Sequence, residues 1–285
     1  MSAAHAASLS EASPAELERI IQQTPAQGVP DEALLRRAEA LYRLGDLQGD
    51  LAQIRAGADL SRQVLAHQES GSHGALWVAA NKNLGTALVM LARRSNDQGQ
   101  LDQAIAAFDA AVVFARDSVP EEWPGLINSL AIAQWSRGSM ARDPAMIRKA
   151  TATFRSALEQ DKVPVGDRDR MRIEVNLASA LVELSSLSKN DQPLDEAVDR
   201  FSAALDRVGR LDMPSQKAII EGNLGQALTV RGWGRKSTAD LERSVDLTKQ
   251  AIDYWESVGA TDARSEAEAN LRQTYQLLTQ LYESR

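Results

Sequence analysis

The 285-residue sequence contains no cysteine, and this absence excludes several classes of site at once. Without thiols the chain has no disulfide, no thiolate nucleophile, no zinc–thiolate site and no iron–sulfur cluster. Histidine is almost as scarce, and the three copies, His5, His67 and His73, lie outside the recurring motifs described below. No HExxH, P-loop or GxSxG motif is present either. The residues therefore indicate no catalytic or metal site, and we expect no cofactor.

The sequence also lacks an excess of basic residues and a long apolar run. Its formal net charge is −7, whereas nucleic acids and anionic membranes require a basic surface. No uninterrupted apolar run reaches the roughly 18 residues that span a bilayer. The N-terminal residues have neither the basic start nor the apolar core of a secretory signal. We therefore expect a cytoplasmic chain that binds neither nucleic acid nor membrane.

Repetition is what the sequence has in abundance. The segment NLGTAL at 83–88 returns as NLASAL at 176–181, NLGQAL at 223–228 and NLRQTY at 270–275. The leucine of this motif recurs at spacings of 46, 47, 47 and 47 residues. Its copies are Leu84, Leu130, Leu177, Leu224 and Leu271. A fixed period of this length is typical of a tandem-repeat architecture.

A second motif keeps the same period and has helical spacing. It reads LDQAIAAFDAAV at 101–112, and its apolar residues Leu101, Ala104 and Phe108 are three and four residues apart. Such spacing places the side chains on one stripe of an α-helix. Further copies begin at Ile147, Leu194 and Leu241, and polar or proline-containing segments separate all the motifs. Each repeat is therefore predicted to be a hairpin of two helices.

A single hairpin cannot bury its own apolar stripe, so successive hairpins are expected to stack and share a core. We expect a flexible leader over 1–13 and one continuous helical solenoid over 14–285. The predicted hairpins cover about 31–70, 71–118, 119–163, 164–212 and 213–260, and a capping helix covers 261–285.

One position in the first motif carries a small residue, which suggests a close approach of two helices. The position holds Gly85, Ala131, Ala178 and Gly225 in four copies. Glycine costs up to about 1 kcal/mol relative to alanine inside a helix, and closer packing would offset that cost. Arg272 takes the position in the last copy, as expected of a terminal helix with one face in water.

The leucine–small pair on the first helix, followed by Ala, aromatic and Ala on the second, resembles the tetratricopeptide repeat (TPR). The resemblance covers about residues 31–283 and implies an all-α, right-handed α-α superhelix whose first helices line a concave, partner-binding face. The unit is some twelve residues longer than the usual 34, and such long units resemble repeats found alongside CHAT-type proteases. Since that catalytic domain requires a cysteine, the resemblance implies that any protease or signalling partner is a separate polypeptide.

The asparagine that opens the first motif suggests a binding surface. Asn83, Asn176, Asn223 and Asn270 precede the packing leucine, so we expect them to turn away from the core. One interpretation is that they form a row of amides that hydrogen-bonds the backbone of an extended peptide, as in some TPR proteins. Alternatively, they are solvated or cap the chain locally. A few hydrogen bonds of about 1 kcal/mol each would not suffice for binding, so side-chain pockets must contribute.

Other candidates for the same face lie about one helical turn from these asparagines. They are Lys82, Thr86, Asn128, Ile132, Arg172, Ser179, Ile219, Gln226, Glu266 and Gln273. Trp135 is interpreted either as an aromatic anchor or as packing between repeats, whereas Trp77 and Trp123, 46 residues apart, are interpreted as structural. Arginines near the ends of the first helices either attract an acidic partner or favour the helix dipole. They are Arg93, Arg94, Arg137, Arg231 and Arg235.

These patterns predict a non-catalytic scaffold or regulatory adaptor that binds a protein or peptide segment on its concave face. The alternative is a small-molecule sensor or enzyme that uses the interior of the superhelix as a pocket. A third reading is self-assembly through exposed repeat ends. The sequence identifies neither the partner nor the oligomeric state, and it does not distinguish an open superhelix from a closed one.

Overall fold

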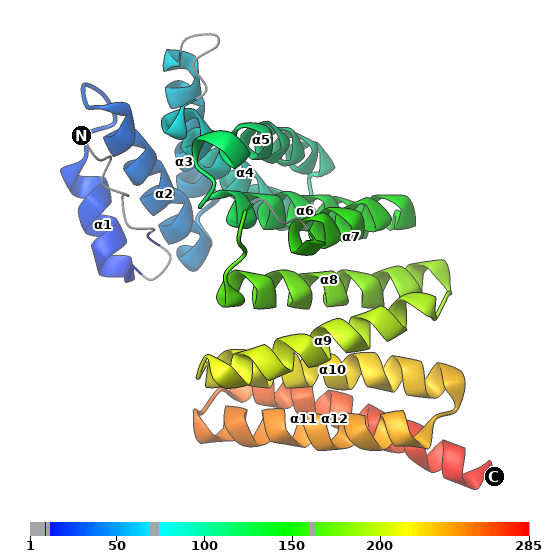
Figure 1. Ribbon diagram of the computed structural model, residues 1–285. Helices are drawn as coiled ribbons and strands as arrows, with labels where there is room; N and C mark the ends of the chain where they lie inside the picture. The colour runs from blue at the N-terminus through cyan, green and yellow to red at the C-terminus, as the bar shows by residue number, and fades with distance from the viewer. Residues whose placement is uncertain (1–8, 10–11, 69–73, 160–162, 285) are drawn as a thin grey trace. The chain divides into compact units, whose positions relative to one another are not determined.

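The computed structural model describes all residues except 1–8, 10–11, 69–73, 160–162 and 285. Over these described residues every regular element is an α-helix, so the all-α prediction is confirmed. The chain divides into two compact units, Met1–Ala141 and Arg142–Arg285. Within each unit, successive helices run antiparallel to one another (Figure 1).

Unit 1 begins with a helix that the repeat pattern did not predict and continues with stacked hairpins. Its helices are α1 (Pro14–Gln23), α2 (Asp31–Gln48), α3 (Leu51–His67), α4 (Ala75–Ser95), α5 (Gln98–Ser118) and α6 (Trp123–Ala141). Helices α2 and α3 form one hairpin and α4 and α5 the next, with α3 packed on α4 and α5 on α6. The first helices of consecutive repeats, α2 and α4, also touch.

Unit 2 has the same construction. Its helices are α7 (Pro144–Glu159), α8 (Asp167–Ser188), α9 (Gln192–Arg210), α10 (Pro214–Arg235), α11 (Thr238–Ser257) and α12 (Thr261–Glu283). Helices α8 and α9 form a hairpin, α10 and α11 form another, and α12 packs on α11. The side chain of Arg272 in α12 is 68% exposed, and the role of this helix as a cap of the stack stays a prediction.

Local capping chemistry explains the unpredicted helix α1. Ser13 accepts a hydrogen bond from the Glu16 backbone N–H, the Glu16 carboxylate accepts one from the Ser13 backbone N–H, and Pro14 occupies the first helical position. This capping box together with an N-terminal proline is a sequence signal for a helix start. The repeat period carried no such information, because α1 has no counterpart in the later units.

The turns within the hairpins repeat as faithfully as the helices. Asn96, Arg142, Lys189 and Lys236 adopt left-handed backbone with φ between 50° and 55°, and they recur at the period of the repeat. The next residue in each turn caps the following helix: Asp97, for example, accepts from the Gly99 N–H at 2.8 Å. A left-handed residue closes the preceding helix and a polar side chain opens the next.

The repeated apolar positions form the core. Phe108, Phe154 and Phe201 of the second motif are almost completely buried. Helix α4 is long and apolar enough to cross a membrane by composition alone. Its buried residues pack against α3 and α5 within unit 1, so we treat it as a core helix.

Candidate functional site

A cavity of about 370 Å³ opens between the first helices and α5 of unit 1. Nine side chains from four helices line it, and α4 contributes more of them than any other helix. They are Asp46 of α2; Thr86, Val89, Met90, Arg93 and Arg94 of α4; Phe108 of α5; and Ser129 and Ile132 of α6. Thr86 and Ile132 are among the residues that the sequence assigned to the groove face.

The floor of the cavity is apolar and depends on the small residue of the first motif. Phe108 reaches the cavity from α5 because its ring lies against the Cα of Gly85, where a Cβ would be only 2.8 Å from the ring. Phe108 itself is only 1% exposed, so the apolar surface that a ligand can reach comes mainly from Met90 and Ile132, which are both partly buried. This arrangement suits an apolar ligand group, because displacing water from such a surface is favourable.

Two hydroxyl oxygens add acceptors to this apolar surface. Thr86 Oγ1 donates to the Lys82 carbonyl oxygen at 2.8 Å, and Ser129 Oγ donates to the Gly125 carbonyl oxygen at 2.9 Å. Each hydroxyl has therefore used its only proton within its own helix. The lone pairs that remain can accept hydrogen bonds, so a ligand near them is expected to supply N–H or O–H groups.

The two arginines at the cavity differ in their ion pairing. Arg94 Nη2 donates to the Asp46 carbonyl oxygen at 2.6 Å and to its Oδ1 at 2.8 Å, so the Asp46 carboxylate is compensated. Arg93 is exposed and pairs with none of the residues that the structure describes. The cavity therefore carries one uncompensated positive charge, on a chain whose net charge is −7.

Asn83 corrects the expectation that every asparagine of the first motif turns away from the core. It is buried, donates from Nδ2 to the Leu35 carbonyl oxygen at 3.1 Å, and accepts from the Tyr42 hydroxyl at 3.3 Å. The first helices of consecutive repeats pack together here, so the position beside the packing leucine is internal. Asn128, another candidate for the groove face, is buried as well.

The remaining asparagines of the row lie in unit 2 and reach its surface. Asn176, Asn223 and Asn270 are half-buried, while the neighbouring candidates Arg172 and Gln226 are exposed. Ser179 is partly buried, and Glu266 and Gln273 are exposed. Their proposed role in peptide binding stays a prediction.

Helix α10 presents the most apolar of these surfaces in unit 2. Ile219, Val230 and Trp233 are 45%, 39% and 44% exposed. With about 3.6 residues per turn, they fall on one stripe of the helix together with Asn223 and Gln226. The sequence placed Ile219 and Gln226 on this stripe, but the two residues toward its C-terminal end were missed.

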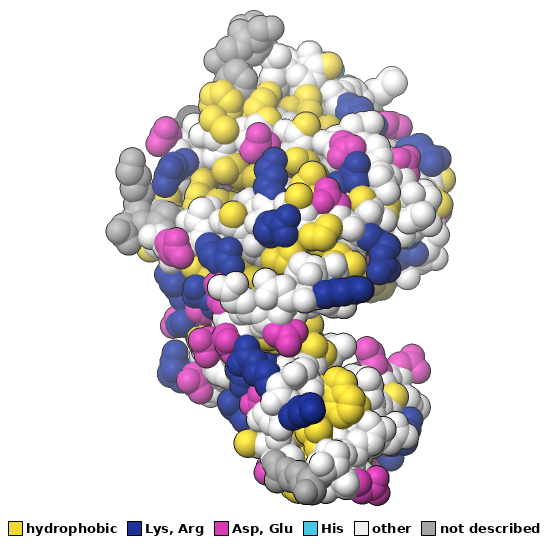
Figure 2. All heavy atoms as spheres, turned by 90° about the vertical axis from the view of Figure 1, so that its right-hand side faces the viewer, with side chains coloured by type: hydrophobic (Ala, Val, Ile, Leu, Met, Phe, Trp, Pro, Cys, Tyr) yellow, Lys and Arg dark blue, Asp and Glu magenta, His cyan; other side chains and the backbone are white. Residues whose placement is uncertain are grey.

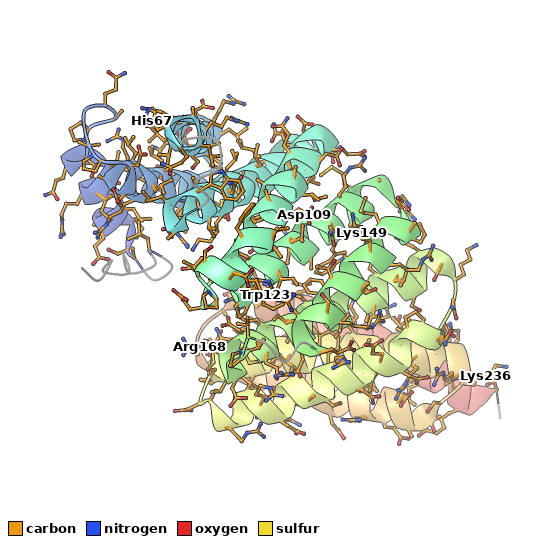
Figure 3. The ribbon with its side chains drawn as sticks, turned by 45° about the horizontal axis from the view of Figure 1, so that its top comes forward. His67, Asp109, Trp123, Lys149, Arg168 and Lys236 are labelled. Atoms are coloured by element: carbon orange, nitrogen blue, oxygen red, sulfur yellow. The ribbon has the colours of Figure 1, made fainter. Side chains whose placement is uncertain are left out.

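The other residues that the sequence singled out have mainly structural contacts. Lys82 Nζ lies 2.7 Å from Glu122 Oε2, and Trp135 is half-buried. Trp77 packs edge-on against Phe114 at 5.1 Å between ring centroids, and the Arg116 guanidinium lies 5.6 Å from the centroid of the buried Trp123 ring. Figure 3 shows Trp123 at the start of α6.

Most arginines near the hairpin turns bind carboxylates of neighbouring helices. Arg137 Nε lies 2.9 Å from Asp102 Oδ1. Arg235 Nη1 lies 2.8 Å from Asp195 Oδ1, and hydrogen bonds from Arg235 lower the pKa of that carboxyl. Figure 2 looks onto the side where the α8–α9 and α10–α11 turns lie, and Lys and Arg side chains stand there beside Asp and Glu side chains.

The histidines give no metal site in the described part of the chain. His67 Nδ1 lies 2.9 Å from Asp31 Oδ1 at the end of α3 (Figure 3), whereas His5 and His73 fall outside the described residues. No group of three or more His, Asp or Glu side chains with metal-binding geometry occurs among the residues that were placed.

Comparisons with known proteins address the fold. No model of a known protein family matches the chain, and no curated protein matches its sequence. Among solved structures, the apo form of RapI superposes with a TM-score of 0.51 at 12% identity, covering 95% of this chain and 68% of RapI. The fold is that of a TPR-like repeat protein.

Two further structures are similar over most of this chain, with lower scores. A signal-transduction ATPase with a tetratricopeptide-repeat sensor from Pyrococcus horikoshii has a TM-score of 0.48 at 11% identity; 94% of this chain and 38% of that one are covered. A Rap conjugation regulator of plasmid pLS20, in complex with the Phr* peptide, has a TM-score of 0.44 at 14% identity, with 95% and 69% covered. The TPR-like chain thus spans well under half the length of the ATPase.

Several cavity residues were missed by reasoning from the sequence. Met90 lies one helical turn beyond Thr86, so helical spacing could have added it to the groove face. Arg93 was named from the sequence, but as one of the arginines near the helix ends and not as part of the groove face. Phe108 was assigned to the core alone. Asp46 belongs to the divergent first repeat, where the motif gives no alignment.

Proposed function

We propose that this TPR-like chain is a non-catalytic, cytoplasmic adaptor that holds a peptide segment of a partner protein in the cavity of unit 1. The composition of the cavity carries the proposal: apolar surface at Met90 and Ile132, hydroxyl oxygens at Thr86 and Ser129, and an uncompensated guanidinium at Arg93. A peptide supplies matching groups, because apolar side chains alternate with backbone N–H donors along it.

The volume limits how much of a partner can enter. A cavity of about 370 Å³ is near the lower end of the range for ligand sites, about 300–1,000 Å³. One or two side chains fill it, so the rest of the peptide lies across the exposed parts of α4 and α6. Binding of this kind needs the apolar anchor, because hydrogen bonds contribute only about 1 kcal/mol each.

The alternative function, a small-molecule sensor or enzyme, would use the same cavity. Asp46 is the only carboxylate among the described lining residues, and Arg94 holds it at 2.8 Å. Acid–base catalysis needs a titratable group free to reach the substrate. The lining therefore favours binding over chemistry.

The resemblance of the long repeat unit to those beside CHAT-type proteases suggests a separately encoded protease or signalling protein as the partner. Co-expression with a candidate, followed by size-exclusion chromatography, tests this hypothesis. Elution of the two chains as separate peaks at micromolar concentration would exclude a stable complex.

A matched pair of variants tests the cavity itself. Ser129→Phe fills the cavity, whereas Ser129→Ala removes only a hydroxyl that is bonded within its own helix. Random peptides displayed on phage are selected on the unmodified protein, and the enriched sequences are synthesised. We expect them to bind the Ser129→Ala protein with near-normal affinity and the Ser129→Phe protein at least about ten-fold more weakly.

Circular dichroism and urea unfolding must show that both variants remain folded. If Ser129→Phe is folded and binds the selected peptides as tightly as the unmodified protein, the cavity is not the peptide site. If no peptide is enriched over an unrelated helical protein, the peptide-binding proposal itself is wrong.

A further inference from the structure

The charges around the cavity indicate which kind of peptide it takes, and this inference rests on the proposed function. Asp46 accepts hydrogen bonds from Arg94 Nε at 3.2 Å and from Nη2 at 2.8 Å. These two groups form a closed ion pair. Arg93, one residue earlier on α4, lines the same cavity and has no such partner among the described residues. A ligand carboxylate is the group that would complete it.

The hydroxyl groups of Thr86 and Ser129 set a second condition on the ligand. Because Thr86 and Ser129 both donate to carbonyl groups of their own helices, they can only accept from a ligand. A carboxylate placed at these oxygens would meet lone pairs on both sides and would be repelled. The ligand carboxylate is therefore directed toward Arg93, and the N–H groups of the ligand toward Thr86 and Ser129.

The apolar floor sets the third condition. Met90 and Ile132 offer partly exposed carbon surface close to these polar groups, so an apolar side chain must stand near the carboxylate in the peptide. Arg93 is exposed at the rim, and a bound chain can continue past it into solvent. This favours the side chain of an internal acidic residue over a terminal carboxylate.

We propose that unit 1 recognises an extended segment in which an apolar residue stands close to an aspartate or glutamate. The apolar side chain packs on Met90 and Ile132, backbone N–H groups donate to Thr86 and Ser129, and the acidic side chain pairs with Arg93. The acidic residue contributes selectivity more than affinity, because an exposed ion pair is weak.

The experiment uses peptides enriched in the phage selection, each compared with a twin in which Asp is replaced by Asn or Glu by Gln. Dissociation constants are measured by fluorescence anisotropy at low salt for the unmodified protein, Arg93→Gln and Arg55→Gln. Arg55 is an exposed arginine on α3 outside the cavity, so its variant matches the change in net charge.

We expect each acidic peptide to bind the unmodified protein about five-fold more tightly than its amide twin. The ratio of the two dissociation constants, amide twin to acidic peptide, should fall to about one in Arg93→Gln and stay near five in Arg55→Gln. In the unmodified protein the same ratio should decrease as the salt concentration is raised. A ratio that Arg93→Gln leaves unchanged overturns the inference. A preference that depends on a free C-terminus, and disappears on amidation, overturns it as well.

The Ser129→Phe variant distinguishes an error in the proposed binding site from an error in the proposed acidic preference. If it keeps full affinity for the selected peptides, the proposed binding site is wrong. If it abolishes binding while Arg93→Gln does not alter the acid-to-amide ratio, the site stands and only the acidic preference is wrong.

Discussion

Phe108 occupies the space that a side chain on Gly85 would need. A Cβ built on Gly85 would lie 2.8 Å from Cζ of the ring and 2.9 Å from both Cε atoms. The missing Cβ allows α5 to pack its phenylalanine against α4, and the same buried ring lies beneath the floor of the cavity. One glycine therefore serves both the packing of the hairpin and the shape of the candidate site.

Gly85→Ala is expected to lower the free energy of unfolding by about 1–2 kcal/mol. Overpacking a rigid buried ring costs about 1–3 kcal/mol. The higher helix propensity of alanine offsets up to about 1 kcal/mol of that cost. In the matched variant Gly225→Ala, the one close contact of the new Cβ is with the Thr248 hydroxyl at 2.6 Å, and the Ser244 carbonyl oxygen lies at an ordinary 3.4 Å. We expect it to change stability by less than about 1 kcal/mol.

Urea unfolding monitored by circular dichroism measures both glycine variants. The displaced Phe108 ring should also shrink the cavity, so Gly85→Ala should weaken the selected peptides while Gly225→Ala leaves them unaffected. Equal losses of stability for the two variants would show that the contact with the ring is not the cause.

Asn83→Ala is expected to destabilise the protein by about 2 kcal/mol. The substitution removes one hydrogen bond to the Leu35 carbonyl and takes away the acceptor of the buried Tyr42 hydroxyl, and a buried polar group that loses its hydrogen bond costs about 1–3 kcal/mol. Asn223→Ala is the comparison, because Asn223 is half-buried and makes no hydrogen bond within the described structure. It should cost less than about 0.5 kcal/mol.

The same substitutions separate packing from binding along the asparagine row. The double variant Asn176→Ala with Asn223→Ala should retain its fold, and a loss of peptide affinity would support the row of amides as a binding element. Unchanged affinity in a folded double variant would show that these asparagines do not bind the peptide.

Glu221→Gln is expected to stabilise the protein at neutral pH. Glu221 is buried, Lys217 Nζ lies 3.3 Å from its Oε1 without forming a hydrogen bond, and burial raises the pKa of the carboxyl. Because the folded pKa exceeds the unfolded one, this carboxyl favours folding below the unfolded pKa, and the contribution is lost as pH rises through the folded pKa. Glutamine should add about 1 kcal/mol at pH 7 and no more than a few tenths near pH 4.

Glu174, which lies one hairpin before Glu221, provides the control. Glu174 is also buried, but Arg207 donates to it from Nε and Nη2 at 3.4 Å. Glu174→Gln should therefore give no gain at pH 7. Chemical unfolding at the two pH values checks both variants, and an equal gain for Glu221→Gln at pH 4 and pH 7 would contradict the role of ionisation.

Arg155 and Glu196 should couple favourably, and the coupling should be lost in acid. The Arg155 Nη2 to Glu196 Oε2 distance is 2.6 Å, and this bonding lowers the pKa of Glu196. A lowered folded pKa stabilises the protein above the unfolded pKa, and the contribution is lost as pH falls through the folded pKa. Both side chains are about one-third exposed, so a double-mutant cycle with glutamine should give only about 0.5–1 kcal/mol at pH 7.

A second double-mutant cycle provides a reference for the coupling energy of Arg155 and Glu196. Arg62 and Asp59 lie 2.8 Å apart on one helix, with 44% and 63% of their side chains exposed, and should couple by less than about 0.5 kcal/mol. Arg155 donates from Nε to Glu196 Oε1 at 2.9 Å as well as from Nη2 to Oε2. If the two cycles give the same energy, this bidentate geometry adds nothing to the coupling.

The sequence by itself determined the helical repeat. Two motifs with one period, each with apolar residues three and four apart, allow only stacked helical hairpins, because side-chain periodicity follows from the backbone geometry of the helix. The turns were equally local, since a left-handed residue followed by Asp, Asn or Ser ends one helix and starts the next. Helix α1 carried its own capping signal, which the search for repeats passed over.

Only the tertiary structure decided which polar residues are exposed or unpaired and so available to bind a ligand. Asn83 and Asn223 share one motif position, yet Asn83 is buried against α2 and Asn223 reaches the surface. Arg93 and Arg94 are neighbours in sequence, yet Arg94 binds Asp46 and Arg93 has no partner among the described residues. Burial and pairing depend on which neighbouring helix lies opposite a side chain, and a repeat period specifies the helix without specifying that neighbour.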